Sequence, residues 1–326
     1  MIDVIASEPH FVDHLAPAWR ALPETVRGVF FARSTRARDA AERHGVSTVG
    51  SLPEGTPLTL VASVHDYRIA RARGRSCVYL NHGVGQAWRK DDGSLVPAGA
   101  GMPKPGVRMF LTPGPFASSV TREANLDAWV REVGSPKLDA HLNREPPSGP
   151  PIVVFSTHWD QRGVPEARGT LGIFMDSIMS LRSRQDFAIA FHAHPLAVKR
   201  VTRAIRRANV PYFATFDEVL ERASAYVTDS SSTLFEAAAV GIPVVALNAP
   251  WYRREHHHGL RFWEAAGVGV NVDAPEMLEA GVLRALANRP EDRALRRKAL
   301  ELAYAPLDGR ATERAVAGIL DALAPY

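Results

Sequence analysis

Residues 225–248 read AYVTDSSSTLFEAAAVGIPVVALN, and this stretch decides the fold that the sequence predicts. Its first four residues, AYVT, are β-prone, and TLFEAAAV is a helix former. Gly241 ends that helix, and Pro243 opens a second short strand, PVVAL. The polar loop DSSS at residues 229–232 joins the first strand to the helix. The stretch therefore predicts a strand–loop–helix–strand unit of a parallel α/β sheet.

The polar loop allows two interpretations. It leaves backbone N–H groups free at a helix N-terminus, where the helix dipole adds partial positive charge, so a phosphate or diphosphate would fit there. Thr233 and Glu236 also fit a capping box, which needs no ligand. Ser230, Ser231 and Ser232 in a row exceed what one helix cap requires. This favours a phosphate cradle that runs from Ser230 to Thr233.

The same alternation of apolar strands and helices extends on both sides of this stretch. Residues 144–151, REPPSGPP, interrupt it, because proline at this density cannot form a central strand. We therefore expect a linker there, between an acceptor-side domain at 1–143 and a donor-binding domain at 152–310. A last helix at 311–326 would cross back to the first domain. The fold class is α/β, with two doubly wound parallel-sheet (Rossmann-like) domains that face a cleft.

The amino-acid composition limits the classes of protein to which this chain can belong. The 326 residues are 46% hydrophobic and 23% charged, as in soluble globular proteins, and the apolar runs are too short for a membrane span. The single cysteine, Cys77, excludes an internal disulfide, and the N-terminus lacks a signal-peptide pattern, so we expect a cytoplasmic protein. A net charge of +4 and a pI of 9.4 leave open an anionic partner, either the inner membrane surface or a polymer, but do not indicate nucleic-acid binding.

Three histidines each follow a predicted strand: His82, His158 and His194. Ligands of open α/β sheets gather outside the carboxyl ends of the strands. An imidazole with a pKa of about 6.5 can accept a proton from an attacking hydroxyl, and a protonated imidazole can neutralise a phosphate. One histidine alone is more often structural, whereas three at strand ends of two domains favour a site.

Two further groups of side chains leave alternatives open. Arg253 and Arg254 lie among aromatic residues, where they either bind a phosphate or form the solvated face of a packed helix. Residues 256–258 are consecutive histidines, and these make a poor ligand set because their side chains point in different directions. No acidic motif follows a strand to hold a divalent ion. We therefore expect no metal and no cofactor.

Three segments carry a resemblance to a known group of enzymes. They are NHGVGQ at 81–86, HAHP at 192–195 and TDSSSTLFEAAAVGIPVV at 228–245. In order and spacing they resemble the GT-B-fold transferases, and most of all the CDP-glycerol glycerophosphotransferase group of teichoic-acid polymerases. The UDP-GlcNAc 2-epimerases share the HP pair and a DSGG version of the loop. This chain has Ser231 and Ser232 where those glycines stand.

The resemblance implies a GT-B architecture and assigns roles to individual residues. His82 matches the proposed base for the acceptor hydroxyl, and Glu236 matches a helix position that binds the nucleotide ribose. His194, Ser231 and Ser232 match groups that hold the donor diphosphate. The donor site expected from the sequence and the resemblance together comprises Ser230, Ser231, Ser232, Thr233, Glu236, His158, Arg253 and Arg254, with His82 and His194 as catalytic residues. The usual tyrosine after the Asp is replaced by Ser230, and the lysine after the HG motif is absent unless Arg89 or Lys90 replaces it.

The function that we expect is transfer of a glycosyl or glycerophosphate group from a CDP-, UDP- or GDP-linked donor to an acceptor hydroxyl, without a metal ion. The acceptor is open and includes an anionic polymer. One alternative is an isomerase of the UDP-GlcNAc 2-epimerase type, which needs no acceptor. Others are a DNA-modifying or polymer-modifying glycosyltransferase and a non-catalytic binder of nucleotide sugars.

Overall fold

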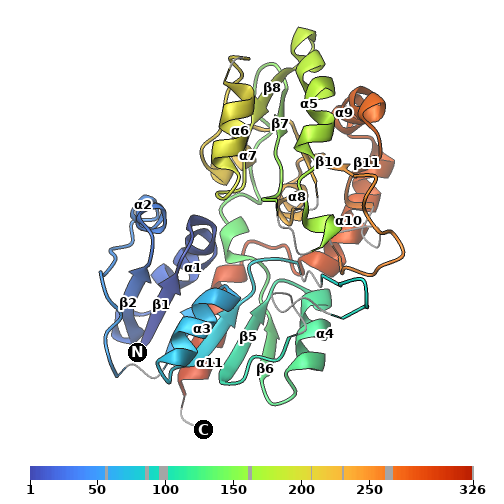
Figure 1. The fold of residues 1–326 in the computed structure, drawn as a ribbon. Helices are drawn as coiled ribbons and strands as arrows, with labels where there is room; N and C mark the ends of the chain where they lie inside the picture. The colour runs from blue at the N-terminus through green and yellow to red at the C-terminus, as the bar shows by residue number, and fades with distance from the viewer. Residues whose placement is uncertain are drawn as a thin grey trace. The chain divides into compact units, whose positions relative to one another are not determined.

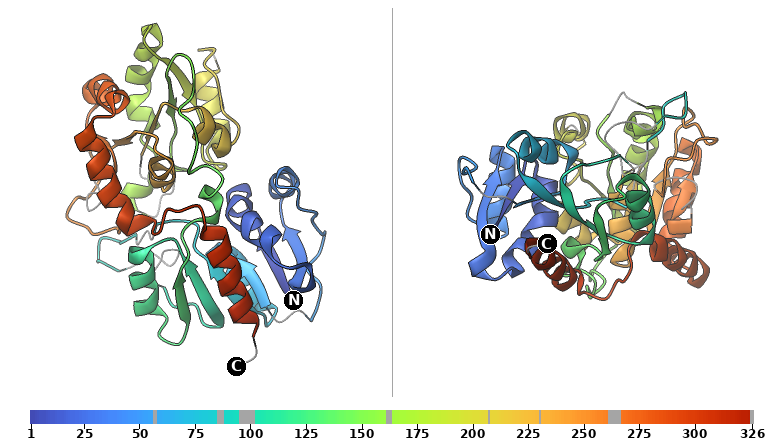
Figure 2. Two further views of the ribbon diagram at one scale, coloured as in Figure 1. Left: turned by 180° about the vertical axis from the view of Figure 1, so that it is seen from behind. Right: turned by 90° about the horizontal axis from the view of Figure 1, so that it is seen from below.

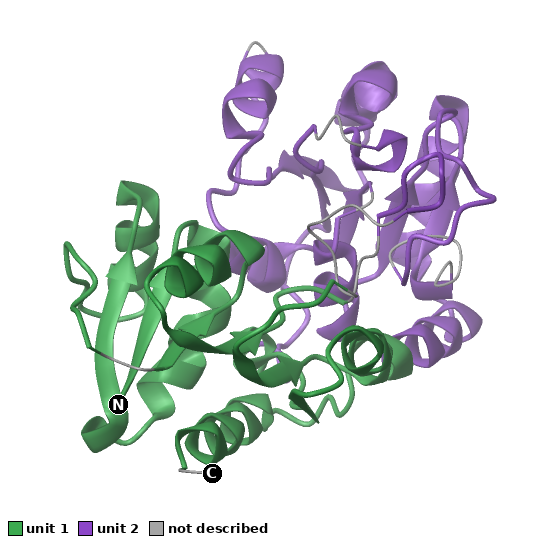
Figure 3. Cartoon of the chain, turned by 60° about the horizontal axis from the view of Figure 1, so that its bottom comes forward, with its two compact units in different colours: residues 1–85, 97–140, 301–326 green, residues 86–96, 141–300 purple. Residues whose placement is uncertain are grey.

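The computed structural model describes residues 1–55, 58–84, 88–94, 102–160, 164–206, 208–229, 231–260 and 267–324 (Figure 1). The chain divides into two compact units (Figure 3). Unit 1 comprises residues 1–85, 97–140 and 301–326, and unit 2 comprises residues 86–96 and 141–300. Each unit has a parallel sheet of its own with helices on both faces.

The sheet of unit 1 has six parallel strands in the order β2-β1-β3-β4-β5-β6. Its topological switch point lies between β1 and β3, because β2 lies on one side of β1 and all later strands lie on the other. Both strands at this point are buried along their whole length, as their apolar sequences require. The strands are β1 (Ile2–Ala6), β2 (Arg27–Ala32), β3 (Leu58–Val61), β4 (Ser76–Leu80), β5 (Val107–Thr112) and β6 (Trp129–Glu132).

Helices cover both faces of this sheet. On one face, α1, α2 and α11 pack on a core that includes Leu15, Leu60 and Ile319. On the other face, α3 packs on Val61 and Phe110. The back view in Figure 2 shows α11, the last helix of the chain, lying along unit 1. The helices of this unit are α1 (Pro9–Ala21), α2 (Thr35–Arg43), α3 (Val64–Ala72), α4 (Pro115–Ala124) and α11 (Ala311–Leu323), with short 3₁₀ helices η1 (Glu24–Val26) and η2 (Pro136–Leu138).

The sheet of unit 2 has five parallel strands in the order β11-β10-β9-β7-β8, so its switch point lies between β7 and β9. Side chains alternate along β9: Val227 joins the core beneath α5 and α9, whereas Tyr226 points to the opposite face, where Phe216 of α7 lies 5.6 Å away between ring centres. The strands are β7 (Ile152–Phe155), β8 (Ala188–Phe191), β9 (Ala225–Thr228), β10 (Val244–Leu247) and β11 (Val270–Val272).

The helices of unit 2 follow its strands in the expected order. They are α5 (Leu171–Ser180), α6 (Val198–Ile205), α7 (Phe216–Arg222), α8 (Thr233–Ala239), α9 (Leu278–Ala287) and α10 (Pro290–Ala303), with 3₁₀ helices η3 (Pro165–Ala167), η4 (Leu181–Ser183) and η6 (Pro275–Met277). The last three residues of α10 are grouped with unit 1. Within the described ranges, no helix is long and apolar enough to cross a membrane.

Two local expectations differ from the structure. The alternative of a capping box at Thr233 and Glu236 does not occur: Ser232 is the N-cap residue of α8, has helical backbone angles, and makes no capping bond with its side chain. A capping box does form at α7, between Thr215 and Glu218. The edge strand β11 was not predicted, because three residues give too little alternation to read.

Candidate functional site

Asp229 organises the loops at the switch point of unit 2. Its buried carboxylate accepts hydrogen bonds from the backbone N–H of His158 at 2.7 Å, from the hydroxyl of Thr157 at 2.9 Å and from the backbone N–H of Thr170 at 3.0 Å. The loop after β9 is thereby tied to the loop after β7 and to the start of α5. Gly169 permits this close approach, because a Cβ there would lie 2.7 Å from the hydroxyl oxygen of Thr157.

His158 follows β7 and is 7% exposed. Its Nδ1 lies 3.2 Å from the carbonyl oxygen of Ala167. Since a carbonyl only accepts, Nδ1 carries the proton, and Nε2 of the neutral ring is left as an acceptor. The centre of the ring is 5.8 Å from that of Trp159 and 6.1 Å from that of Trp88. The predicted donor-site residue is thus held in one orientation and one tautomer.

His194 follows β8 and has the opposite tautomer. Its Nδ1 accepts a hydrogen bond from the backbone N–H of Leu196 at 3.2 Å, so Nε2 carries the proton and is a donor. The centres of the His194 and His158 rings are 5.9 Å apart. The structure therefore brings together two of the three predicted histidines, one with a donor Nε2 and one with an acceptor Nε2.

The loop after β9 contains a directed chain of hydroxyl groups. The hydroxyl of Thr233 donates to Ser231 Oγ at 2.8 Å, so the contact at 2.9 Å between Tyr226 and Thr233 must have the tyrosine as its donor. Burial raises the pKa of Tyr226 to about 12, which keeps this phenol protonated. Ser231 Oγ accepts from Thr233 and keeps its own O–H for another acceptor. A hydroxyl chain that ends in a donor suits an anionic oxygen.

The other predicted residues of this loop and of α8 are less well placed to contact a phosphate. Helix α8 has only seven residues, so the helix dipole that the sequence suggested is short, and the hydroxyl and imidazole groups are the main polar groups of this loop. Ser232 is half-buried at the helix start, and Glu236 is 2% exposed in the first turn. Ser230 lies outside the described residues.

Arg253 belongs to a cluster of charged side chains within unit 2, and its predicted role as a phosphate ligand stays a prediction. Its guanidinium donates to both carboxylate oxygens of Glu166, at 2.9 and 2.7 Å, and to the carbonyl oxygen of Arg89 at 2.9 Å, and it also pairs with Asp91. Glu166 is fully buried, and its second partner is the ring of His258, with 3.3 Å between Nε2 and Oε2. Four of the five guanidinium donors are thus used within the protein.

Protonation within this cluster follows from its contacts. Burial alone would raise the pKa of Glu166, but hydrogen bonds from Arg253 and His258 hold it well below its usual range. His258 Nδ1 accepts from the backbone N–H of Arg89 at 3.2 Å, so Nε2 carries the proton that faces Glu166. Arg254 is different: its side chain is 56% exposed and pairs with Asp273 at 2.5 Å. Its predicted role as a phosphate ligand stays a prediction.

His82 lies in unit 1, directly after β4, as the sequence predicted. Its Nδ1 lies 2.5 Å from the carbonyl oxygen of Ala62, which follows the neighbouring strand β3. The carbonyl fixes the proton on Nδ1 and leaves Nε2 with a lone pair. This is the tautomer that a general base needs.

Two histidines that the sequence did not single out, His10 and His14, lie near His82. The rings of His10 and His14, both on α1, have their centres 6.1 Å from that of His82. Burial, followed by the charges of Lys137, His82 and His10, lowers the pKa of His14 well below 6.5. His10 lies four residues after β1 and in the first turn of α1, which begins at Pro9. The strand-end criterion that selected His82 could have found His10 if it had been extended to the first turn of the following helix.

No family model matches the sequence, and no curated protein matches it. Solved structures with a similar fold include S. aureus MnaA with UDP, at 14% identity, a TM-score of 0.65 and coverage of 99% of this chain and 96% of that chain. The Methanocaldococcus jannaschii UDP-GlcNAc 2-epimerase in complex with UDP-GlcNAc and UDP has 16% identity, a TM-score of 0.65 and coverage of 98% and 99%. The wall teichoic acid polymerase TagF, in a variant with CDPG, has 12% identity, a TM-score of 0.61 and coverage of 98% and 88%. The two units are Rossmann-like domains of the GT-B type.

The fold class and the resemblance that the sequence predicted are thereby confirmed, since both named groups are among the structures with this GT-B-type fold. The domain limits and the roles of the individual site residues stay predictions. No set of three or more His, Cys, Asp or Glu side chains in the described part of the chain is arranged to hold a metal ion. The expectation of a metal-independent site is untested.

Proposed function

We propose that this protein is a transferase that binds a nucleotide-diphosphate-activated donor in unit 2 and transfers its glycosyl or glycerophosphate group to an acceptor hydroxyl. The observation that carries the proposal is the hydroxyl chain from Tyr226 through Thr233 to Ser231. It ends in a donor at the switch point of a Rossmann-like sheet, where such folds bind nucleotides. The protonated Nε2 of His194 adds a second donor for a diphosphate oxygen.

In this proposal His82 is the general base. The acceptor oxygen attacks either the anomeric carbon or the phosphorus that bears the glycerol, while its proton passes to Nε2 of His82. In glycosyl transfer the bond from the anomeric carbon to the diphosphate breaks, and a nucleoside diphosphate leaves. In glycerophosphate transfer the bond between the two phosphates breaks, and CMP leaves. Ser231 and His194 would stabilise the charge that develops on the leaving phosphate.

Nucleotide binding is the first test. Thermal unfolding is followed with CMP, CDP, UMP, UDP, GDP, ADP and dTDP without added metal, because a ligand that binds only the folded state raises its stability. We expect a shift with one base, and CDP or CMP would indicate glycerophosphate transfer whereas UDP, GDP or dTDP would indicate a sugar donor. A shift that Ser231→Ala and His194→Ala both reduce supports the donor site. No shift with any nucleotide would overturn the proposal.

The role of His82 is tested separately. His82→Ala should keep the nucleotide-induced shift and lose transfer by about 10²-fold to 10⁴-fold, the usual contribution of general acid–base catalysis. His44→Ala is the matched control, because His44 pairs with Asp13 on another part of unit 1. Full transfer activity in His82→Ala would remove His82 as the base and leave the donor site intact.

Epimerisation is the second candidate function, and the similar solved structures support it as well as they support transfer. MnaA and the UDP-GlcNAc 2-epimerases have TM-scores of 0.59 to 0.65 to this chain, and the polymerase structures have TM-scores of 0.60 to 0.62. An epimerase needs only the nucleotide sugar. Incubation with UDP-GlcNAc alone, followed by NMR for UDP-ManNAc, separates the two: product without an acceptor supports the epimerase, and its absence together with transfer to an acceptor supports the transferase.

The basic charge of the chain favours an anionic acceptor such as a polymer with phosphate groups. One variant of this proposal has DNA as the acceptor, and a binding experiment tests it directly. Binding of a DNA duplex that weakens steeply with salt would support it, and no binding at low salt would exclude it.

A further inference from the structure

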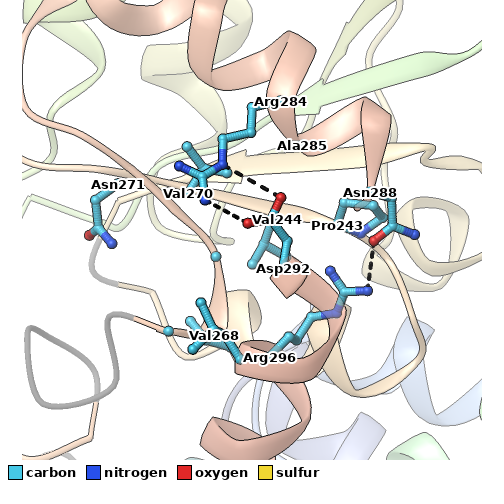
Figure 4. Close-up of a pocket in the computed structure, with 13 residues that line it drawn as sticks. Pro243, Val244, Val268, Val270, Asn271, Arg284, Ala285, Asn288, Asp292 and Arg296 are labelled. Carbon is cyan, nitrogen blue, oxygen red and sulfur yellow. Dashed lines mark hydrogen bonds and ion pairs between the residues drawn. The ribbon is translucent and has the colours of Figure 1, made fainter. Parts of the chain in front are cut away.

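A cavity lies at the amino-terminal ends of the strands of the unit 2 sheet. Its volume is about 480 Å³, within the range of ligand pockets, and it lies between the amino-terminal ends of β10 and β11 and the turn from α9 to α10 (Figure 4). The strands are parallel, so this edge is opposite to the carboxyl ends that carry His158, His194 and Ser231. The cavity is therefore distinct from the proposed donor site.

Arg296 is the main polar feature of this cavity. The residue is on α10, lines the cavity and is 7% exposed. Among the described residues, its guanidinium makes one hydrogen bond, from Nη2 to Asn288 Oδ1 at 2.9 Å (Figure 4). A guanidinium has five N–H donors, so most of its donor capacity is unused by the described residues. Burial, and then the nearby charge of Arg293, lower the pKa of Arg296, and the charge of Asp292 opposes them in part.

The carboxylate in this cavity is already engaged by another arginine. Asp292 pairs with Arg284, with 2.6 Å between the carboxylate and Nη2 (Figure 4). The hydrogen bond from Arg284 is also the main cause that lowers the pKa of Asp292. Asp292 also interacts with Arg296, but more weakly than with Arg284. Two arginines and one aspartate leave the lining with one excess positive charge.

The rest of the lining is largely apolar. Val244 and Val270 come from the strand ends, Val268 precedes β11, and Leu295 of α10 is 52% exposed. Apolar walls around one under-used cation suit a ligand that has an apolar body and one anionic group. We propose that this cavity is a binding site for a small carboxylate or phosphate monoester with an apolar body, and that Arg296 is its anion ligand.

A purely structural role for Arg296 makes a different prediction. Asn288 ends α9 in the left-handed conformation, with φ of 42°, and Arg296 holds that turn by one hydrogen bond. If that were its whole role, removing the guanidinium would change stability without affecting the binding of any anion. Ligand titration therefore separates the two roles.

The test uses isothermal titration of the full chain with benzoate and with phenyl phosphate, and with benzyl alcohol as the neutral probe. We expect one or both anions to bind, the alcohol to bind more weakly, and Arg296→Met to weaken anion binding about tenfold or more, as for a lost hydrogen bond to a charged group. Arg297→Met is the matched control, because Arg297 is the next residue on α10 and is exposed. The relative affinity of the two probes distinguishes a carboxylate ligand from a phosphate ligand.

Leu295→Trp provides a second variant if Arg296→Met fails to fold. It keeps Arg296 and fills the cavity from an exposed position, so it should also weaken anion binding. Equal affinities in the wild type, Arg296→Met and Leu295→Trp would overturn the proposal, as would the absence of binding by either anion. Arg296→Met should not alter the nucleotide-induced shift, so failure of this proposal is independent of the proposed function.

Discussion

The carboxylate of Asp229 accepts a hydrogen bond from the backbone N–H of His158 at 2.7 Å, although 71 residues separate them in sequence. This bond joins the ends of β7 and β9, the two strands that flank the switch point of unit 2. Asp229, the first residue of the DSSS loop, therefore holds two loops together and does not itself contact a bound ligand in our proposal. Asp229 positions a predicted site residue, whereas the hydroxyl groups that follow it are directed towards another acceptor.

Removing this carboxylate should destabilise the protein strongly. Asp229→Ala leaves at least the N–H groups of His158 and Thr170 without their buried acceptor, and each such loss costs about 1–3 kcal/mol. We expect the free energy of unfolding in urea to fall by about 3 kcal/mol or more. Asp176→Ala on the exposed side of α5 is the control and should change it by less than about 0.5 kcal/mol. Equal effects of the two substitutions would show that Asp229 does not hold these loops.

The hydroxyl chain predicts a remote effect of Tyr226. Tyr226→Phe removes the first donor of the chain, so Thr233 loses a partner and Ser231 becomes a less well-oriented donor. The affinity for the nucleotide that gives a thermal shift should fall about threefold to tenfold, the range for one hydrogen bond of about 1 kcal/mol. The control is Tyr212→Phe, since Tyr212 is a half-buried tyrosine of the same unit. Unchanged affinity in Tyr226→Phe would remove the chain from the donor site.

The neighbours Arg253 and Arg254 should differ sharply in their effect on stability. Arg253→Ala leaves the fully buried Glu166 without its main partner, and breaking a buried pair in this way costs about 3–5 kcal/mol. Arg254→Ala breaks a pair in which both side chains are about half exposed, which costs about 0–1 kcal/mol. Urea denaturation at neutral pH measures both. Similar values for the two would contradict the structural role of Arg253.

The same ion pair predicts a loss of stability in acid. Because the pKa of Glu166 is lower in the folded chain than the usual value of about 4.3, the unfolded chain takes up a proton first. The contribution of the pair is complete above about pH 4.3 and declines as the pH falls below it. Glu166→Gln should therefore be less stable than the wild type at pH 7 and approach it in acid. A constant difference at all pH values would contradict the lowered pKa.

His14 predicts a second pH dependence in a higher range. Its pKa is lowered in the folded chain, so below about pH 6.5 the unfolded chain binds a proton that the folded chain does not. Between about pH 7.5 and 5.5 the wild type should lose about 1 kcal/mol more stability than His14→Gln. The exposed residue His257 supplies the control, and His257→Gln should follow the wild type. If His14→Gln also follows the wild type, His14 does not resist protonation.

The sequence predicted the fold well because its signals are local. The stretch at 225–248 forms a strand, loop, helix and strand as expected, since apolar runs, glycine and proline act within a few residues of one another. The strand-end rule also placed His82, His158 and His194 at the carboxyl edges of their sheets. The alternative of a cap at Thr233 and Glu236 does not hold, because several short polar residues in a row can each be the N-cap, and Ser232 has that position.

The sequence could not predict which polar groups are used by the protein itself. The sequence left Arg253 either as a phosphate ligand or as part of a packed helix, and nothing near it in sequence shows that Glu166, 87 residues away, pairs with its guanidinium. His10 and His14 were missed beside His82, since α1 and the end of β4 come together only in the folded sheet.

The sequence by itself thus determined the class of fold, the strand, loop, helix and strand at 225–248, and the strand ends that carry histidine and serine, because these depend on local periodicity and turn residues. The tertiary structure alone decided the tautomers of His82, His158 and His194, the anchoring role of Asp229, the pairing of Arg253 with Glu166 and the burial of Arg296. Each of these depends on a hydrogen-bond partner or on burial that long-range packing supplies, and such partners leave no mark within a short stretch of sequence.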